Sequence, residues 1–174
     1  MEMEKIRRQE RRIRVGIVVA ILLFAGVAAI AQVGWLDGIL KKSPVEIAKS
    51  AGVVETADAV KIPLKALDSG KALFLQQEVD GRQLYYFALK SSDDAYRAVF
   101  DACNGCFQSN LGYRQEGDRI VCNKCEVAFH PERIEEIKGG CNPHPLARKV
   151  EGQYLVIQKG DIAAGKNYFP GNRS

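Results

Sequence analysis

Hydrophobic residues form their longest uninterrupted run near the N-terminus of the chain. Residues 15–33 contain no charged side chain, and Gln32 is the one polar side chain among them. A helix of that length rises about 28 Å, which approaches the roughly 30 Å hydrocarbon core of a bilayer. Trp35 follows at the position expected of an interfacial aromatic anchor. The pattern predicts a single transmembrane helix over residues 15–36.

A basic arm, residues 1–14, precedes this run and carries Lys5, Arg7, Arg8, Arg11, Arg12 and Arg14. Because positively charged flanks stay in the cytoplasm, the arm is predicted to be cytoplasmic and the C-terminal part to lie outside. Residues 29–31 (Ala-Ile-Ala) also have the form of a signal-peptide cleavage site, so a cleaved signal peptide is the alternative. Both interpretations place the main domain outside the cytoplasm. We predict a single-pass protein of the bacterial inner membrane with a periplasmic C-terminal domain.

After the apolar run, the pattern changes to short elements separated by turns. Residues 37–59 are predicted to be a linker, in which Ser43-Pro44 starts a short helix that Gly52 ends. From residue 60 to residue 174, short apolar and aromatic runs alternate with turns every eight to twelve residues, roughly the spacing of a sandwich or barrel. The fold class predicted for residues 60–174 is therefore all-β, a small β-sandwich or barrel.

Two local signals fix parts of this β domain. Asp80-Gly81 separates the aromatic-rich runs 71–79 and 82–90, which predicts a tight β-hairpin. Residues 95–102 form a further strand that leads directly into the first cysteine motif. Pro63 cannot donate a backbone hydrogen bond, so it suggests that the strand around Ile62 is an edge strand or begins there.

Charge and motifs exclude several function classes. The 174-residue chain has a formal net charge of +4, and much of the excess lies in the basic arm. The remainder carries no basic stripe interleaved with aromatic residues, so no nucleic-acid partner is predicted. No Ser-His-Asp set, phosphate-binding loop or carboxylate pair suggests an enzyme with its own substrate. The protein is accordingly predicted not to be an enzyme by itself.

The residues with candidate chemistry lie in the segment from Cys103 to His144. This segment contains all five cysteines and both histidines. Cys103-x-x-Cys106 and Cys122-x-x-Cys125 are separated by fifteen residues. Two such pairs let four sulfurs converge from two short loops, as in an all-thiolate metal site or an iron–sulfur cluster. Neither pair is followed by His, which excludes the c-type haem motif.

The spacing does not by itself identify the group that is bound. An iron–sulfur cluster and a structural zinc ion both fit four cysteines. Disulfides are a further alternative, because thiols outside the cytoplasm tend to be oxidised. A disulfide within a CxxC motif closes a very small loop and stabilises little by chain entropy, which favours a metal or cluster.

Three more residues are candidates for the same region. Cys141 lies in the tight segment Gly139-Gly140-Cys141-Asn142-Pro143. It is an additional ligand, a free thiol over the centre, an attacking thiol in a redox exchange, or a structural cysteine. His130 and His144 either complete a second site with Cys141 or are ordinary loop histidines.

The order of these parts resembles a Rieske-type domain. A strand with Ile-Pro-Leu, a hairpin with an Asp-Gly turn and a strand ending in Phe-Asp-Ala precede the first ligand loop. In Rieske domains the two loops supply Cys-x-His and Cys-x-x-His. Here both histidine positions are cysteine, and the first loop is one residue longer. Because the two imidazoles raise the reduction potential, a true Rieske potential is not expected.

Residues from about 62 to 169 resemble the FtrD-like membrane iron–sulfur family. The matching segments are Phe100-Asp101-Ala102-Cys103-Asn104-Gly105-Cys106, residues 112–118, Val121-Cys122-Asn123-Lys124-Cys125, and Gly139-Gly140-Cys141-Asn142-Pro143. The family is a domain found beside bacterial iron-uptake permeases. The resemblance implies a membrane-tethered metal centre and an iron–sulfur cofactor.

Together these observations predict a membrane-anchored, extracytoplasmic protein with a four-cysteine centre. Its expected function is electron transfer or iron transport with a membrane partner, such as an iron permease or a redox protein. A zinc-binding interaction or assembly module is the first alternative. Thiol–disulfide exchange is the second, although the chain lacks the βαβ pattern of a thioredoxin-like motif.

Overall fold

A computed structural model describes residues 43–135 and 140–173, which belong to one compact unit. The basic arm and the transmembrane helix predicted over residues 15–36 lie outside the described residues. Within the described ranges, no helix is both long enough and apolar enough to cross a membrane.

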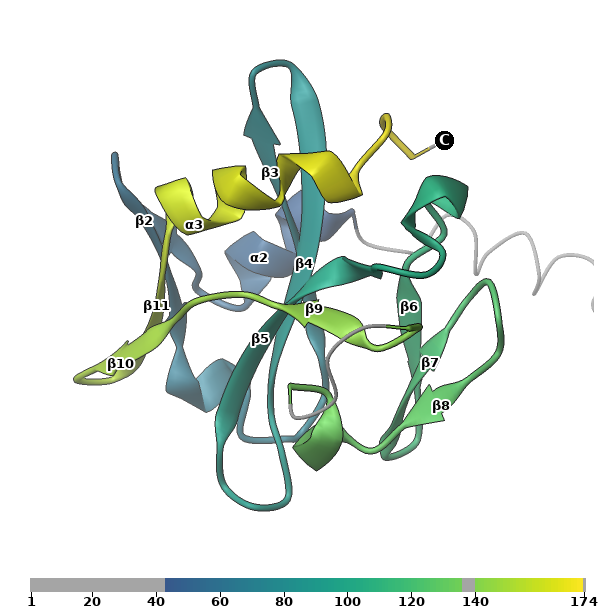
Figure 1. Ribbon diagram of the computed structural model, residues 1–174. Helices are drawn as coiled ribbons and strands as arrows, with labels where there is room; N and C mark the ends of the chain where they lie inside the picture. The colour runs from purple at the N-terminus through teal and green to yellow at the C-terminus, as the bar shows by residue number, and fades with distance from the viewer. Residues whose placement is uncertain (1–42, 136–139, 174) are drawn as a thin grey trace, which may run out of the picture. The chain divides into compact units, whose positions relative to one another are not determined.

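The described residues form three antiparallel sheets, which confirms the all-β prediction (Figure 1). The first has the order β1-β2-β11-β10, the second β3-β4-β5-β9 and the third β6-β7-β8. The strands are β1 (Val54–Glu55), β2 (Ala59–Pro63), β3 (Leu73–Val79), β4 (Arg82–Lys90), β5 (Tyr96–Cys103), β6 (Tyr113–Glu116), β7 (Arg119–Cys122), β8 (Ala128–Phe129), β9 (Pro143–Pro145), β10 (Lys149–Glu151) and β11 (Tyr154–Gln158). The helical segments are α2 (Pro44–Ser50), η1 (Leu64–Ala66), η2 (Phe107–Ser109), η3 (Pro131–Arg133), α3 (Lys159–Ala164) and η4 (Gly165–Tyr168).

The hairpin predicted around Asp80-Gly81 is confirmed. Strands β3 and β4 pair in register from Leu73↔Ala88 to Val79↔Arg82. Asp80 and Gly81 both have positive φ, 50° and 73°. This backbone is that of a type I′ turn, whose twist matches the flanking strands.

The second sheet is buried on both faces, because its strands separate two hydrophobic clusters. On β4, Tyr86 and Ala88 point into a cluster shared with the first sheet. Phe87 and Leu89, one residue out of phase, point into a cluster shared with the third sheet. Alternate residues of a strand face opposite sides, so a nearly continuous apolar run is required here. The aromatic residues of this hairpin therefore pack in the core, as expected.

The cysteine motifs lie at the second of these clusters. Cys103 ends β5 and shares a face with Val99, and both belong to the cluster between the second and third sheets. Cys122 ends β7 and is buried in the same cluster beside Ile120. In Figure 1 the third sheet lies at the opposite side of the domain from β10 and β11. The fold thus brings the ends of two strands from different sheets together.

Residues 37–59, predicted as a linker, include regular structure in their described part. The expected short helix is α2, and it begins with a capping box in which Ser43 and Glu46 satisfy each other's backbone N–H groups. Ile47 and Ala48 of α2 pack against the first cluster. Strand β1 pairs with β2 through Val54↔Lys61 and Glu55↔Val60.

The edge-strand interpretation of Pro63 is wrong. Strand β2 lies inside the first sheet, between β1 and β11. Its pairing with β1 ends at Lys61, whereas Pro63 is the last residue of β2 and lies opposite Tyr154. Proline is tolerated at this point because no ladder bond to β1 is required there.

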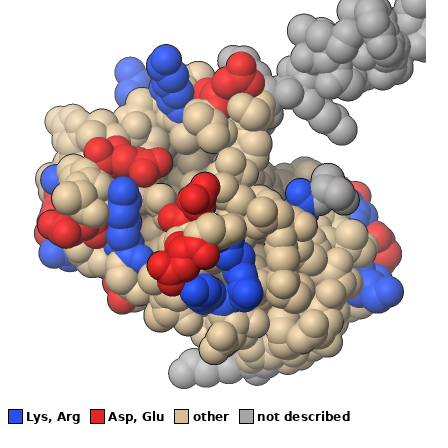
Figure 2. Space-filling model, turned by 90° about the horizontal axis from the view of Figure 1, so that it is seen from above, with Lys and Arg blue, Asp and Glu red and all other residues tan. Residues whose placement is uncertain are grey.

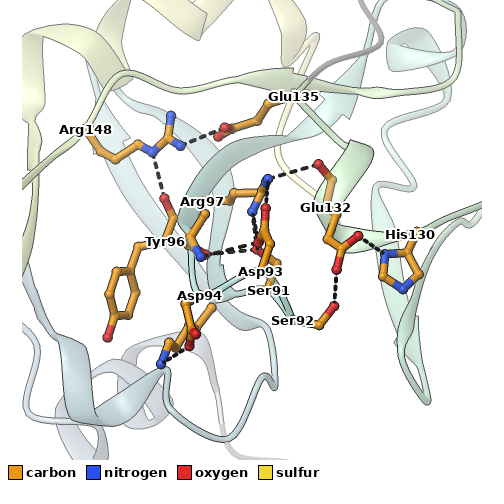
Figure 3. Close-up of polar contacts among 12 residues, drawn as sticks. Ser91, Ser92, Asp93, Asp94, Tyr96, Arg97, His130, Glu132, Glu135 and Arg148 are labelled. Carbon is orange, nitrogen blue, oxygen red and sulfur yellow. Dashed lines mark hydrogen bonds and ion pairs between the residues drawn. The ribbon is translucent and has the colours of Figure 1, made fainter.

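Arg97 of β5 connects the β4–β5 turn to η3 (Figure 3). Its Nη1 and Nη2 atoms donate to Asp93 Oδ1 and Oδ2 at 2.7 and 2.8 Å. Nη2 also donates to the backbone carbonyl of Glu132 at 3.0 Å. Nearby, Arg148 Nη2 lies 2.6 Å from Glu135 Oε2. These bonds hold the segment after β8 against β5.

The Asp93–Arg97 pair predicts an acid-sensitive contribution to stability. Hydrogen bonds from Arg97, and then from Ser91, hold the pKa of Asp93 well below its usual range. A depressed carboxyl pKa stabilises the fold above the unfolded-state pKa, and that stabilisation is lost as pH falls through the folded-state pKa. We expect Asp93→Asn to be less stable than the wild type at pH 7 but to lose less stability between pH 5 and pH 2. Thermal unfolding midpoints across this range test it, and equal slopes for the two proteins would contradict it.

Surface charges of opposite sign are mixed over the face seen in Figure 2. Among the described residues, several cations lie in ion pairs, including Lys166 Nζ with Asp80 Oδ2 at 2.7 Å and Lys159 Nζ with Glu55 Oε2 at 3.3 Å. Exposed pairs of this kind contribute little stability, typically about 0–1 kcal/mol. They are consistent with a surface on which neither sign of charge dominates.

Candidate metal centre

The first cysteine loop follows β5 directly and folds back over its own first sulfur. The backbone N–H of Cys106 donates to Cys103 Sγ at 3.2 Å. The turn continues into η2, where the Ser109 N–H and Oγ both donate to the Cys106 carbonyl, at 3.0 and 2.7 Å. Cys103 is buried and Cys106 is partly buried. The loop therefore points two sulfurs to one side, one deep and one nearer the surface.

The second cysteine loop connects β7 to β8 and is closed by backbone bonds. The Cys122 N–H donates to the Val127 carbonyl at 3.0 Å, and the Glu126 N–H donates to the Cys122 carbonyl at 2.9 Å. Glu126 adopts a positive φ of 57°. Arg114 of β6 reaches this loop, with Nη2 2.6 Å from Glu126 Oε2. Cys122 is buried, whereas Cys125 is exposed.

Five sulfurs gather where these loops meet. Cys106 Sγ lies 2.9 Å from Cys103 Sγ and 3.4 Å from Cys122 Sγ. Cys125 Sγ lies 2.6 Å from Cys141 Sγ. Two groups have all their sulfurs within 4.8 Å of one another, namely Cys103, Cys106 and Cys122, and Cys106, Cys125 and Cys141. Cys106 is common to both groups.

The segment Gly140–Pro145 holds Cys141 over the first loop. The Gly105 N–H donates to the Gly140 carbonyl at 2.9 Å. The Tyr113 hydroxyl donates a short hydrogen bond to the Cys141 carbonyl. Strand β9 pairs with β5, so that Pro143 lies opposite Cys103. Three separate connections thus fix the backbone around Cys141.

This donor set fits an iron–sulfur cluster or a thiolate-bound metal. Iron in a [2Fe–2S] cluster takes two terminal ligands per iron, so the four sulfurs need not all be mutual neighbours. Cys103 and Cys122 form the buried side of the arrangement, and Cys106 and Cys125 the side nearer the surface. Thiolates are also the preferred ligands of structural zinc. The chemistry of the site therefore agrees with both groups expected from the sequence.

The pKa values of the cysteine thiols are shifted in different directions. Burial, followed by the neighbouring Cys103 and Cys122 thiols, raises the pKa of Cys106 far above its usual range. Burial, followed by the Cys141 and Cys122 thiols, raises the pKa of Cys125 to about 12. Burial also acts to raise the pKa of Cys122, but hydrogen bonds from the N–H groups of Cys125 and Lys124 and from the Cys125 and Cys106 thiols together lower that pKa. A metal cation bound by the thiolates would lower these raised pKa values, because its positive charge stabilises the deprotonated sulfurs.

A buried ion pair lies directly behind the first loop. Asp101, two residues before Cys103, is 4% exposed. Its carboxylate accepts a hydrogen bond from the Tyr113 N–H at 2.6 Å and a short one from Arg173 Nη1. Burial raises the pKa of Asp101, and Arg173 acts against that rise. Arg173 lies 72 residues beyond Asp101 in the chain, so no local sequence pattern predicts it as the partner of that carboxylate.

Neither histidine lies among the sulfurs. His130 Nδ1 lies 3.7 Å from Glu132 Oε2, on the side of η3 seen in Figure 3. The His144 ring packs on Tyr168 with centroids 4.5 Å apart, and burial lowers its pKa. Among the described residues, neither belongs to a group of three ligand atoms within 4.8 Å. The structure thus does not bring His130 and His144 together with Cys141.

Gly105 provides a direct test of the contact between the two segments. A Cβ at this position would lie 2.9 Å from the Gly140 carbonyl oxygen, a backbone atom. We expect the clash in Gly105→Ala to push the first cysteine loop away from residues 140–141, to displace the Cys103 and Cys106 sulfurs, and to lower metal affinity by about 10–100-fold, as loss of an orienting contact does. Metal titration of the reduced protein measures this. Gly160→Ala in α3 is the matched control, because a Cβ there meets nothing within 4 Å; equal affinities for the two variants would contradict the prediction.

Comparison with known proteins identifies a similar solved structure and a matching family. No curated protein matches it. A solved structure, the quaternary ammonium Rieske monooxygenase CntA, is similar with a TM-score of 0.39 and 14% sequence identity. The similarity covers 64% of this chain and 34% of that chain, so this chain spans about a third of its length.

A family model gives a more specific result. The model described as membrane iron–sulfur containing protein FtrD-like matches residues 67–169. This range is more than half of the 174 residues and includes β3 to η4, with all five cysteines. The chain therefore belongs to the family of FtrD-like membrane iron–sulfur containing proteins.

Proposed function

We propose that Cys103, Cys106, Cys122 and Cys125 hold an iron–sulfur cluster with which this protein transfers electrons, or supports iron transport, at a membrane. The observation that carries the proposal is the sharing of Cys106 by two groups of three sulfurs. An iron–sulfur cluster supplies one-electron transfer when it is bound. Membership of an iron–sulfur family supports iron in preference to zinc.

The chain's own residues prepare the site for such a role. Cys103 and Cys122 are 2% and 1% exposed, so the protein covers one side of the centre. Cys125 is exposed and leaves the other side open to a partner. An edge close to solvent shortens the path for an electron, while the buried side excludes water from the sulfurs. This asymmetry suits exchange with another protein more than catalysis on a small substrate.

The proposed setting is the bacterial inner membrane. A single N-terminal helix over residues 15–36 would anchor the domain, with residues 60–174 in the periplasm. Anchoring keeps the centre near a membrane partner and raises its effective concentration there. The partner is proposed to be an iron permease or a membrane redox protein. The Rieske-like arrangement of strands and ligand loops belongs to the same proposal.

Metal analysis of the full chain tests the function. The protein is expressed and purified without oxygen in detergent, and its iron, zinc and acid-labile sulfide are measured with its visible spectrum. We expect iron and sulfide in equal amounts, with charge-transfer bands that bleach on reduction with dithionite. Zinc without colour would replace the proposal by a structural zinc module. Metal-free protein with two disulfides would replace it by thiol–disulfide exchange.

A further inference from the structure

A fifth cysteine stands at a centre that needs only four terminal ligands. The structure places the Cys141 sulfur in the same group as Cys106 and Cys125, with all three within 4.8 Å of one another. Four cysteines complete a [2Fe–2S] or [4Fe–4S] cluster, and four complete a tetrahedral zinc site. One sulfur is therefore in excess whichever of these groups is bound.

The shortest separation identifies the two sulfurs that compete. Cys125 Sγ and Cys141 Sγ lie 2.6 Å apart, closer than Cys106 Sγ is to Cys103 Sγ or to Cys122 Sγ. Sulfurs bound at about 2.3 Å in a tetrahedral shell lie about 3.8 Å from one another, so Cys125 and Cys141 would have to separate further than either of the other two pairs to bind together. Because five sulfurs compete for four corners, the two that lie closest are assigned to one corner. Only one of them can bind there at a time.

Separate parts of the fold hold these two cysteines. Cys125 is on the β7–β8 loop, which is bonded to β6 through Arg114. Cys141 is on the segment fixed to the first loop by the Gly105 N–H and to β6 by the Tyr113 hydroxyl. Asn142 Nδ2 adds a bond of 2.9 Å to the Ile134 carbonyl. Loss of the Cys125 thiol would therefore leave Cys141 in place.

We propose that Cys141 is an alternative ligand, which takes the place of Cys125 at the exposed corner of the centre. The inference rests on the proposed four-cysteine centre and adds a ligand exchange to it. In the exchange, the bond from the metal to Cys125 sulfur breaks as a bond to Cys141 sulfur forms. The proton of the Cys141 thiol passes to the Cys125 sulfur. One thiolate replaces another, so no electron is transferred and the charge of the centre does not change.

The exchange has a consequence for access to the centre. Cys125 is exposed, so it is the ligand most open to modification by oxidants or to displacement by an incoming group. Cys141 is partly buried and is attached elsewhere. Because Cys141 can bind in its place, the centre keeps its metal when the Cys125 sulfur dissociates.

Serine variants of the full chain, purified without oxygen, test the exchange. We expect Cys125→Ser and Cys141→Ser each to retain bound metal, with iron, zinc and sulfide measured per chain. The double variant is expected to lose more than about tenfold in metal content, since no thiolate then reaches that corner. Loss of metal in Cys125→Ser as complete as in the double variant would overturn the inference. Loss in both single variants would overturn it too, because both sulfurs would then be required together.

Alkylation of the loaded wild-type protein gives a second readout that does not depend on folding of a variant. Iodoacetamide is added under native, oxygen-free conditions, and labelled peptides are identified by mass spectrometry. We expect one label per chain, found on Cys125 in some molecules and on Cys141 in others. A label confined to Cys141 would overturn the exchange.

The outcome for the wild type separates this inference from the proposed function. Zinc in place of iron would refute the iron–sulfur function, and the same variants would then decide the exchange by their zinc content. A wild type that binds no metal would refute both. Iron and sulfide in the wild type, together with their loss in Cys125→Ser, would refute the exchange alone.

Discussion

Replacing Cys106 by serine is expected to reduce metal affinity by more than about 100-fold, the largest effect of any single substitution at the centre. Loss of a group that merely orients a ligand costs about 10–100-fold, and Cys106 is itself a proposed ligand. Its sulfur is the one member common to both three-sulfur groups. Without it, the two groups are reduced to the pairs Cys103 with Cys122 and Cys125 with Cys141, and no sulfur belongs to both.

Titration of the reduced protein with ferrous iron and with zinc measures this loss. Cys141→Ser is the matched control, because it also removes a thiol from one of the groups but leaves Cys103, Cys106, Cys122 and Cys125 intact. Far-UV circular dichroism establishes whether each variant is folded. Cys106→Ser protein that is folded and retains the affinity of the Cys141→Ser control would show that Cys106 does not bind metal.

The position of Cys106 illustrates what the sequence could predict. The two CxxC motifs predict Cys103, Cys106, Cys122 and Cys125 as ligands, because each motif is local and the strands before them are strongly patterned. The arrangement of the five sulfurs in space could not be predicted from the motifs alone. It depends on β5 and β7, which belong to different sheets and both contribute residues to the second hydrophobic cluster.

Local turn chemistry also predicted the β3–β4 hairpin and the start of α2. Asp80-Gly81 determined a hairpin, and Ser43-Pro44 determined the start of α2, because both signals act within a few residues. Pro63 misled because its cost depends on which neighbour needs a donor, which is a property of the sheet. The linker prediction did not include β1, whose two residues acquire their structure by pairing with β2.

Contacts that orient the site were beyond the sequence for a related reason. The Gly105 N–H bonds to the Gly140 carbonyl, and the Tyr113 hydroxyl bonds to the Cys141 carbonyl. A backbone acceptor carries no sequence signature. Glycine in a cysteine loop suggests a close approach by another chain segment, but it does not say which segment. The same limit applies to Arg173, which is far from Asp101 in the chain.

Replacing Arg173 by methionine is expected to lower the free energy of unfolding by about 3–5 kcal/mol, as does the loss of one partner from a buried ion pair. The Asp101 side chain is 5% exposed, so its carboxylate would remain buried without its cation. Arg173 also donates through Nη2 to the Asp101 carbonyl at 2.6 Å and lies over the Tyr85 ring, 4.2 Å from its centroid. The loss is large compared with a typical total of about 5–15 kcal/mol.

Two further variants separate the buried charge from the other contacts. Arg119→Met is the control, because Arg119 is half exposed and its Nε lies 3.9 Å from Oδ1 of the exposed Asp118. We expect this variant to change the free energy of unfolding by no more than about 0.5 kcal/mol.

In the double variant Asp101→Asn with Arg173→Met, no charge remains to be buried. We expect it to be more stable than Arg173→Met alone by about 1–3 kcal/mol, the cost of an unsatisfied buried group. Urea unfolding of each full-length protein in the same metal state measures these differences. If the double variant were no more stable than Arg173→Met, packing of the arginine on Tyr85 would be the main contribution, and the ion pair behind the first cysteine loop would have little effect on stability.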